Sequence, residues 1–507
     1  MSQRILSNFL TKPFVITVNS GADSQFIIKT NSATFSYDYS VRTSDGQVFA
    51  NQTGDLTITF PAINTDYDII IKGIFPALYP GINTDANELK IVDIKSFGFY
   101  GSSGVYQLYV FKGCSNLVIS ATDTGKLGGV TVFEHFFSGC SSLTSLPFID
   151  TSSGSNFRYF IYNVLGISEV PLFDTSNATN FYSAFGNLSV TSLPLLNTSN
   201  VTNFSFSFRN NTALTSFPAI DTSSGLTFYY AFFNCSSLTS FPALDFSSAT
   251  RVDYAWKDCT SLTTFPFINT SSCTNFKEAW NGCPIASFPT IDTSGGVDFL
   301  NTWRANLFAS FPLLDFSSAT SLQRAWQSCT NLTSFPLIVI PNVTDISFAW
   351  SICSKLISFP LIDTSGVQLF NGAWLSCIDL TSFPALNFTS GTNFFQAWFN
   401  CNTLVEFPSV TFPAATNLGQ AWMNCSSLTT FPANVFDTTN CKNFEDAFTN
   451  TALTATSIDN ILVSINASGA AGGNFKQSGG SAPSVTGEAA IDALRTNGWN
   501  ITVTGGY

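Results

Sequence analysis

The sequence predicts a mainly β solenoid, in which repeated coils stack on one another and a different segment covers each end. The first observation is a proline that returns every 24 residues, or every 23 in three cases. The second is an aromatic residue fourteen positions after most of these prolines. The third is composition, since 45% of residues are hydrophobic and only 10% are charged, so Ser, Thr and Asn must form the surface. The repeat prolines are Pro147, Pro171, Pro194, Pro218, Pro242, Pro266, Pro289, Pro312, Pro336, Pro360, Pro384, Pro408 and Pro432.

Residues 1–95 are expected to form a β-sandwich of immunoglobulin-like size, because short runs of strand-forming residues alternate with turn signals. Leu56–Phe60 alternates apolar and polar residues, and Ser44-Asp45-Gly46 is typical of a turn. We expect this domain to anchor the protein to a partner rather than to bind a ligand. The predicted strands are Phe14–Val18, Gln25–Lys29, Thr34–Val41, Leu56–Phe60, Asp68–Gly73 and Leu89–Ile94.

Residues 96–453 are expected to form a leucine-rich-repeat-like array of 23–24-residue coils. A full coil reads Phe-Pro, an acidic or amide residue, a Ser/Thr run and Ala-aromatic, with Cys three residues later and Leu three further on. The pattern Ala-aromatic-x-x-Cys-x-x-Leu-x-x-apolar-Pro resembles the BspA-like, Treponema-type leucine-rich repeat of microbial surface proteins. The resemblance implies a leucine-rich-repeat fold and a bacterial surface protein. This chain departs from the pattern in its frequent Trp and in its Asp-Thr-Ser-Ser segment.

Two recurring positions are predicted to form buried ladders along the array. The aromatic ladder is interpreted as core rather than as a carbohydrate-stacking stripe, because Phe replaces Trp and no polar residue does. The cysteine ladder is interpreted as reduced thiols, since parallel inward side chains seldom reach disulfide geometry and a zinc site needs four converging ligands. Asn306 occupies the cysteine position in one coil. The ladder residues are Trp256, Trp280, Trp303, Trp326, Trp350, Trp374, Trp398, Trp422, Cys235, Cys259, Cys283, Cys329, Cys353, Cys377, Cys401 and Cys425.

A third recurring position, three residues after the proline, holds Asp or Asn. The following Ser/Thr residues predict an Asx turn, in which the side chain accepts a hydrogen bond from the amide two residues on. The alternative is a Ca²⁺ ladder, which would need six to eight oxygen ligands. These residues are Asp150, Asp174, Asn197, Asp221, Asp245, Asn269, Asp292, Asp315, Asp363 and Asn387.

Residues 454–507 are expected to form a small α/β cap that covers the end of the array. Helices are predicted over Ser457–Asn466, with Ser457 or Asp459 near its N-cap, and over Gly487–Thr496. A loop is expected over residues 467–480 and a last strand over Trp499–Val503. This segment resembles the closing segments of phage-encoded repeat proteins.

The positions next to Ala-Trp vary freely, and solenoids bind along an extended face, so these positions form one predicted binding face. The other is the Ser/Thr-rich face before each Phe-Pro, and a merely solvated surface is the alternative for both. The net charge of −12 and the absence of a basic cluster disfavour nucleic acid. The sequence contains no run of 18 apolar residues, so membrane insertion is not expected. The predicted face residues are Asp253, Tyr254, Lys277, Glu278, Arg304, Arg324, Phe395 and Phe399.

Three functional hypotheses follow, and none involves a cofactor or metal. The first is a non-enzymatic phage virion surface protein (a fibre, spike or decoration protein) that attaches to a host protein or glycan. It would join other virion proteins through residues 1–95, and the lack of an export signal in Met1–Thr11 favours it. The second is a bacterial cell-surface adhesin. The third is a glycan-degrading tailspike, although no catalytic motif is present. A homo-oligomer is left open.

Overall fold

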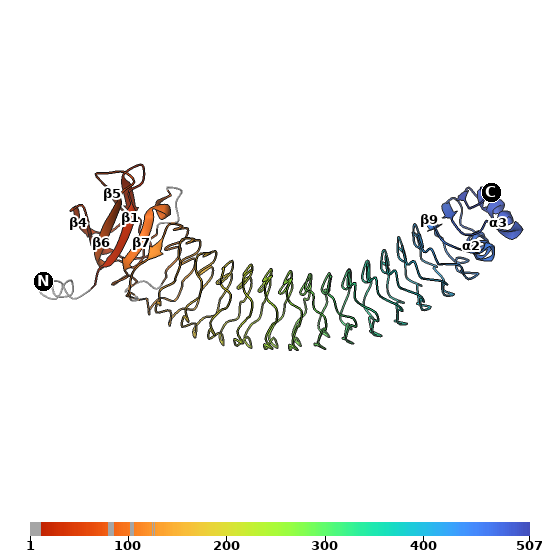
Figure 1. Ribbon diagram of the computed structural model, residues 1–507, viewed down its shortest axis with the longest axis horizontal. Helices are drawn as coiled ribbons and strands as arrows, with labels where there is room; N and C mark the ends of the chain where they lie inside the picture. Colours follow the sequence, from red (N-terminus) through yellow and green to blue (C-terminus); the bar gives the residue numbers. More distant parts are fainter. Residues whose placement is uncertain (1–11, 80–85, 102–105, 124, 126) are drawn as a thin grey trace. The chain divides into compact units, whose positions relative to one another are not determined.

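The computed structural model describes residues 12–79, 86–101, 106–123, 125 and 127–507. The chain divides into two units, Met1–Ala249 and Thr250–Tyr507, and each is described by itself. Both units consist mainly of successive coils of one repeat, which Figure 1 shows as a series of similar loops. The described residues therefore form a repeat fold.

The N-terminal region of the first unit contains two antiparallel assemblies. One is a sheet with strand order β4-β3-β6-β1-β7-β8, and the other is the pair β2-β5. All six predicted strands overlap observed ones. The prediction missed β4, which has no buried face because its five residues are all exposed or half-buried. The elements are β1 (Phe14–Asn19), β2 (Gln25–Ile28), β3 (Asp38–Thr43), β4 (Val48–Gln52), β5 (Leu56–Thr59), β6 (Asp66–Ile74), the 3₁₀ helix η1 (Asn87–Lys90), β7 (Ile91–Ser96) and β8 (Val118–Ile119).

The larger sheet continues into the first coil. Strand β7 pairs with β1 on one side and, in parallel, with β8 of the first coil on the other, and Figure 1 shows β1, β6 and β7 side by side. The carboxylate of Asp123 accepts hydrogen bonds from the amides of Phe97 and Gly98, at 3.0 and 2.8 Å. Strand β7 crosses residue 95, so the larger sheet does not end at the predicted domain boundary. That boundary and the immunoglobulin-like sandwich remain predictions.

Backbone hydrogen bonds join neighbouring coils, and those around the aromatic position of each coil run in one direction. We call the residue fourteen positions after each repeat proline the slot residue. Around it, amides of one coil donate to carbonyls of the next, as from Tyr159 to Tyr182 at 2.9 Å and from slot residue Ile161 to Ala184 at 3.0 Å. The last repeat in the second unit uses the same pattern, since the amide of Trp422 donates to Ala447 at 3.0 Å. These contacts fix equivalent residues side by side.

The coils contain turns and single β bridges rather than continuous strands. The residues two positions before and two positions after the slot adopt positive φ, as at Tyr254 (60°) and Asp258 (61°) around Trp256. A left-handed residue reverses the backbone, so an extended strand cannot pass through it. Neighbouring coils therefore bridge at single positions such as Asp345 and Leu369. The expectation of a mainly β array is corrected to this extent.

The slot residues form the core of the array. All eight slot tryptophans are fully buried. Trp350 stacks on Trp326 at 5.4 Å and on Trp374 at 5.9 Å, with interplanar angles of 8° and 6°. Phe335 and Phe359 meet its ring edge-to-face at 5.1 and 4.7 Å. The aromatic ladder is therefore core packing, with no face left for a ligand.

The Asx turns follow the prediction. Asp292 accepts from the amide of Ser294 at 3.0 Å, and Asn197 accepts from Ser199 at 3.2 Å. The buried Thr that follows the Asx residue links the coils, because Thr293 Oγ1 donates to the carbonyl of Asp315 at 2.5 Å. Each carboxylate is therefore used within its own turn.

The end of the second unit is a three-stranded parallel sheet with two helices. Strand β10, between β9 and β11, lies inside the predicted loop. The N-cap of the first helix is Thr454, whose side chain accepts from the amide of Ser457. Ser457 thus lies near the N-cap, in the first turn, but neither predicted side chain caps the helix: Ser457 Oγ accepts from the amide of Phe431 of the array, and Asp459 from that of Ser484, at 3.0 Å each. The elements are β9 (Asn443–Thr449), α2 (Ala455–Ala467), β10 (Asn474–Ser478), α3 (Val485–Thr496) and β11 (Asn500–Thr502).

Among the described residues, no helix has the length and apolar character needed to cross a membrane.

Candidate binding face

The predicted face residues lie on the surface that surrounds the slot, at one of three positions. These positions are three and two residues before the slot residue and one after it. Because the slot residue and the preceding Ala are buried, these three positions carry the side chains that differ from coil to coil. In both units, the predicted face therefore consists of the side chains at these three positions of each coil.

Four of the predicted residues are brought together in the second unit, and we call this group, with Lys257, the charged cluster. It comprises Tyr254, Lys257, Lys277, Glu278 and Arg304, which come from three successive coils. Lys257 Nζ lies 2.5 Å from Glu278 Oε2. The ammonium groups of Lys257 and Lys277 lie 5.5 and 5.8 Å from the centre of the Tyr254 ring. The cluster therefore combines an ion pair with cation–π contacts.

Amide side chains complete this network. Asn281 Nδ2 donates to Glu278 Oε2 at 3.1 Å, and Asn301 Nδ2 donates to Glu278 Oε1 at 3.4 Å. Arg304 is exposed, and its Nε donates to Gln327 Oε1 at 3.1 Å. Glu278 is thus held by three partners, whereas the guanidinium of Arg304 faces solvent.

Burial and neighbouring charges shift the pKa values of two carboxyl groups in opposite directions. Burial raises the pKa of Asp258, with a further increase from the negative charge of Glu278, against the attraction of Lys257 and Arg304. Burial also raises the pKa of Glu278, but hydrogen bonds from Lys257 and Asn281 outweigh it and the net pKa is lowered. Glu278 therefore stays ionised, and Asp258 holds its proton to a higher pH than an exposed Asp.

The other four predicted residues do not join the cluster. Asp253 is only 2% exposed and pairs with Arg251 through contacts of 2.8 and 2.7 Å, so its carboxylate is withheld from solvent. Arg324 is exposed and lies over the Phe348 ring at 5.3 Å. Phe395 and Phe399 are half-buried, in a coil further along.

The equivalent positions of the first unit hold aromatic residues that the sequence analysis did not select. We call them the aromatic strip. Its rings pack against one another along successive coils, as His135 does on Tyr159 at 4.4 Å and Phe206 on Tyr230 at 5.3 Å. Their position relative to the slot is visible in the sequence, but the predicted face was defined by positions next to Ala-Trp, and these coils contain no Trp. The strip comprises Tyr109, His135, Tyr159, Tyr182, Phe206, Tyr229 and Tyr230.

All twelve cysteines are buried, and none of them forms a disulfide. Seven of the eight ladder cysteines donate their thiol proton to the carbonyl of the preceding coil's slot residue, as Cys377 does to Trp350 at 3.2 Å. Asn306 makes the same bond to Trp280 at 2.9 Å. The cysteine position therefore needs a small buried donor, which either residue supplies.

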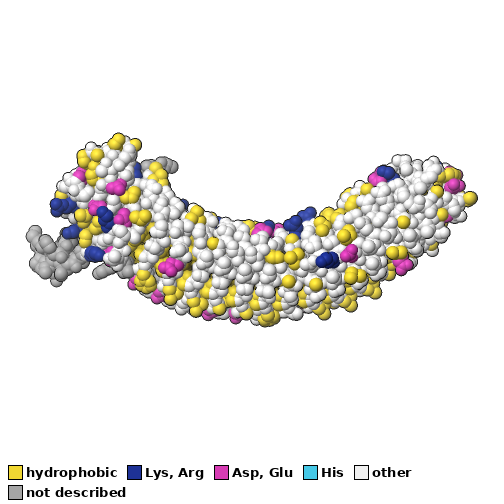
Figure 2. All heavy atoms as spheres, in the orientation of Figure 1, with side chains coloured by type: hydrophobic (Ala, Val, Ile, Leu, Met, Phe, Trp, Pro, Cys, Tyr) yellow, Lys and Arg dark blue, Asp and Glu magenta, His cyan; other side chains and the backbone are white. Residues whose placement is uncertain are grey.

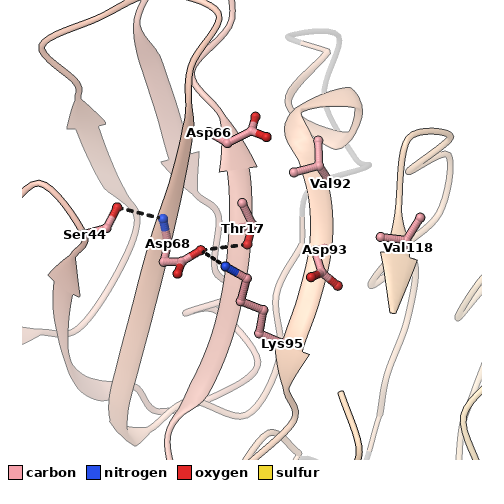
Figure 3. Close-up of a pocket in the computed structure, with 8 residues that line it drawn as sticks. All are labelled: Thr17, Ser44, Asp66, Asp68, Val92, Asp93, Lys95 and Val118. Carbon is pink, nitrogen blue, oxygen red and sulfur yellow. Dashed lines mark hydrogen bonds and ion pairs between the residues drawn. The ribbon is translucent and has the colours of Figure 1, made fainter. Parts of the chain in front are cut away.

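An open pocket of about 560 Å³ lies on the larger sheet of the first unit (Figure 3). Its polar side chains bond one another: Asp68 Oδ1 accepts from Thr17 Oγ1 at 2.8 Å and from Lys95 Nζ at 2.7 Å. Asp93 accepts from the amide and hydroxyl of Ser120. Within the described ranges, no three His, Cys, Asp or Glu residues are grouped so that they could hold a metal ion. The pocket is therefore a satisfied polar surface.

Comparisons with known proteins give a limited result. No protein-family model matches the chain, and no curated protein matches it. Two similar solved structures are leucine-rich repeat proteins. That from Bacteroides ovatus ATCC 8483 is 15% identical, with 72% of this chain and 88% of that chain covered and a TM-score of 0.39. That from Eubacterium ventriosum ATCC 27560 is 15% identical, with coverages of 68% and 86% and a TM-score of 0.32. At these TM-scores neither likeness bears on function.

Proposed function

We propose that this chain is a non-enzymatic recognition protein that attaches to a protein or glycan through the surface around its slot residues. The observation that carries the proposal is the charged cluster, in which Tyr254, Lys257, Lys277 and Glu278 are joined by ion-pair and cation–π contacts. Amide side chains hold Glu278 and the exposed Arg304. Packing of the coils requires none of these charges, since other coils carry uncharged residues at the same positions. A placed group of charges that the fold does not need is typical of a binding surface.

The array is proposed to act as a solenoid that displays this surface, with residues 1–95 as its mount and residues 454–507 as its cap. On the face shown in Figure 2, charged side chains are sparse over the array, and backbone and uncharged side chains cover most of it, with hydrophobic groups along the lower edge. A local group of charges on a largely uncharged surface gives a partner one favoured orientation. In any other orientation the charges of the cluster would be buried without a partner charge, which costs free energy.

We place the protein at a bacterial cell surface, since the repeat pattern resembles that of microbial surface proteins. The virion hypothesis gains no support from the comparisons, and neither does the likeness of residues 454–507 to phage-encoded caps. The two settings make different predictions. Proteomics of cell envelopes and of purified phage particles from the same source would find the chain in only one of them.

Binding assays with the full chain test the recognition function. Labelled protein is expected to bind intact target cells or their extracted surface material, and Arg304→Gln combined with Lys277→Gln is expected to weaken binding. The matched control is Arg495→Gln, which removes an arginine that lies over the Tyr507 ring in the cap. If the double variant and the control bind equally, the charged cluster is not the contact surface.

Glycan cleavage is the second candidate, because Asp258 and Glu278 have pKa values shifted in opposite directions on neighbouring coils. Glycosidases pair one carboxyl group of raised pKa with one that stays ionised, and the directions of these two shifts match that pattern. Asp258→Asn would abolish such an activity while leaving binding intact. The absence of new reducing ends in a polysaccharide panel treated with the wild-type protein would exclude it.

A further inference from the structure

We infer that the aromatic strip of the first unit, together with Arg158 and Arg209, binds an acidic polysaccharide. The strip does not include the charged cluster, and the inference rests on the proposed recognition function. Its rings follow one another from coil to coil: Tyr182 meets Tyr159 at 5.5 Å and Phe206 at 5.2 Å. The repeat thus creates a row of evenly placed aromatic groups, to which a polymer of repeated units is the matching ligand.

The rings of the strip are only partly buried, so a part of each is accessible to a ligand. The seven strip residues are all half-buried, unlike the fully buried slot residues beside them. Neighbouring rings cover part of each other's faces, as His135 and Tyr159 do at 4.4 Å, so a ligand meets the exposed remainder of each ring, an apolar surface on which the C–H groups of a sugar can pack. Tyr adds a hydroxyl group that can hydrogen-bond to sugar hydroxyls, so one residue offers both contacts.

Two arginines are held within the strip by its rings. Arg158 Cζ lies 5.4 Å from the centre of the Tyr159 ring and 5.1 Å from that of Tyr182. Arg209 Cζ lies 5.3 Å from the Tyr162 ring and 4.8 Å from the Phe206 ring. A guanidinium is a planar fork that can bind a carboxylate or sulfate through two hydrogen bonds, and stacking on aromatic rings fixes the plane of that fork.

The charges around the strip favour an anion. Arg158 pairs with Glu134 at 3.3 Å, whereas Arg209 forms no ion pair among the described residues. Its Nη2 donates to Tyr162 Oη at 3.2 Å, and its Nε is shielded from solvent without a hydrogen-bond partner there. Lys112 lies over Tyr109 at 5.0 Å. Three cations and one carboxylate on this surface contrast with a net charge of −12 for the chain.

The ligand class follows from both features. Nucleic acid would also supply rings and negative charge, but a phosphate at every unit would meet a chain that is strongly negative overall. A polysaccharide whose acidic groups are separated by uncharged sugars, as in hyaluronan, carries fewer charges per unit length and presents sugar rings between them. It fits a row in which aromatic residues outnumber arginines.

The experiment uses affinity electrophoresis and calorimetry of the full chain with polygalacturonate, alginate, hyaluronan and heparin. Methyl-esterified polygalacturonate is the uncharged control, and a single-stranded oligonucleotide tests the nucleic-acid alternative. We expect at least one acidic polysaccharide to bind. Arg158→Gln with Arg209→Gln should weaken that binding by about tenfold or more, because a charge-assisted hydrogen bond is lost at each site. Tyr182→Ser should also weaken polysaccharide binding, but the dependence of the affinity on salt concentration should not change. Arg495→Gln should have no effect on binding.

The melting temperature of each variant checks that it is folded. If Arg209→Gln unfolds the chain, Arg209→Lys replaces it in the binding experiment. Lysine keeps the charge without the planar fork, so a several-fold loss of affinity is still expected. The inference is overturned if no acidic polysaccharide binds, if the arginine variants bind like wild type, or if the oligonucleotide binds more tightly than every glycan. Binding of the full chain to target cells in those cases would leave the proposed recognition function standing.

Discussion

At the residue scale, His135 shows how the surroundings of one side chain determine its chemistry. Its ring lies between Tyr109, at 4.9 Å, and Tyr159, at 4.4 Å, and its Nδ1 has no hydrogen-bond partner among the described residues. Burial, with repulsion from Lys112 and Arg158, lowers its pKa from 6.5 to about 4. The imidazole is therefore neutral at pH 7 and serves as an aromatic member of the strip.

This pKa makes stability depend on pH in a defined range. Because the folded pKa lies below the unfolded value, the unfolded chain binds more protons between pH 4 and pH 6.5. The contribution of His135 is complete above about pH 6.5 and falls as the pH is lowered toward about 4. As the only histidine of the chain, it gives a single imidazole NMR signal, which should titrate near pH 4.

His135→Phe is the control, since Phe206 occupies the equivalent position in another coil. The free energy of unfolding of wild type relative to this variant should decrease as the pH is lowered through the same range. A midpoint near 6.5 for the imidazole would show that the ring is exposed and that the stacked geometry is wrong.

Cys377 tests the role of the cysteine ladder. Its thiol donates to Trp350, and burial raises its pKa well above the usual value. Cys377→Val should cost about 1–3 kcal/mol, because it leaves a buried carbonyl without a donor. Cys377→Asn should be milder, since Asn306 fills the same position with the same bond. Urea unfolding curves measure both differences.

The same ladder predicts the chemistry of the thiols. All should resist a thiol reagent in the native protein, since burial disfavours the reactive thiolate, and all twelve should react after denaturation without a reductant. Consecutive disulfides in that experiment would contradict the ladder.

At the element scale, the coil is defined by what its slot residue contacts. Trp350 lies between two tryptophans and two phenylalanine edges, and its Nε1 has no hydrogen-bond partner in the described part of the chain. Trp350→Ala should cost on the order of 3–5 kcal/mol, because neighbouring coils cannot close the cavity. Trp350→Phe should cost less, since it keeps a stacked ring and removes the unpaired N–H group.

Thermal and urea unfolding of the two variants check this order. A wild-type melting temperature for Trp350→Ala, together with loss of ligand binding, would make the ladder a binding stripe instead of a core.

The period of the repeat, its buried positions and its Asx turns could be predicted because each depends on residues that recur at fixed spacing. The left-handed residues could not, since Tyr254, Arg324 and Phe348 adopt positive φ although none of these residue types favours it. Inter-coil hydrogen bonds impose that conformation. Strand β10 was missed for a similar reason: Asn474–Ser478 has only Phe475 and Gln477 buried, and pairing with β9 makes it a strand. The aromatic strip was missed for a different reason: the predicted face was defined by positions next to Ala-Trp, and the coils of the strip have no Trp in the slot.

At the scale of the whole molecule, the N-terminal region of the first unit has two possible roles. It can anchor the protein to a partner, or it can cover the apolar end of the first coil. The sequence suggests a mount that is separable at residue 95. The structure adds contacts across that position: Ser96 Oγ donates to the carbonyl of Pro13 at 2.9 Å, and the Phe14 ring lies 4.6 Å from that of Tyr100. Gln107 Nε2 donates to Pro76 at 2.9 Å. The region therefore also covers the apolar end of the first coil.

Deletion of residues 1–95 distinguishes the two roles. The truncated chain would lose most of β7, leave β8 without its neighbour and expose the rings of Tyr100 and Phe111, which are fully buried in the intact chain. Exposed strand edges and apolar surface promote association, so we expect aggregation or oligomers by light scattering and a lower melting temperature. A monomeric truncated chain with the wild-type melting temperature would instead show that residues 1–95 are an independent mount. Loss of partner binding by that soluble form would then assign the anchor to this region.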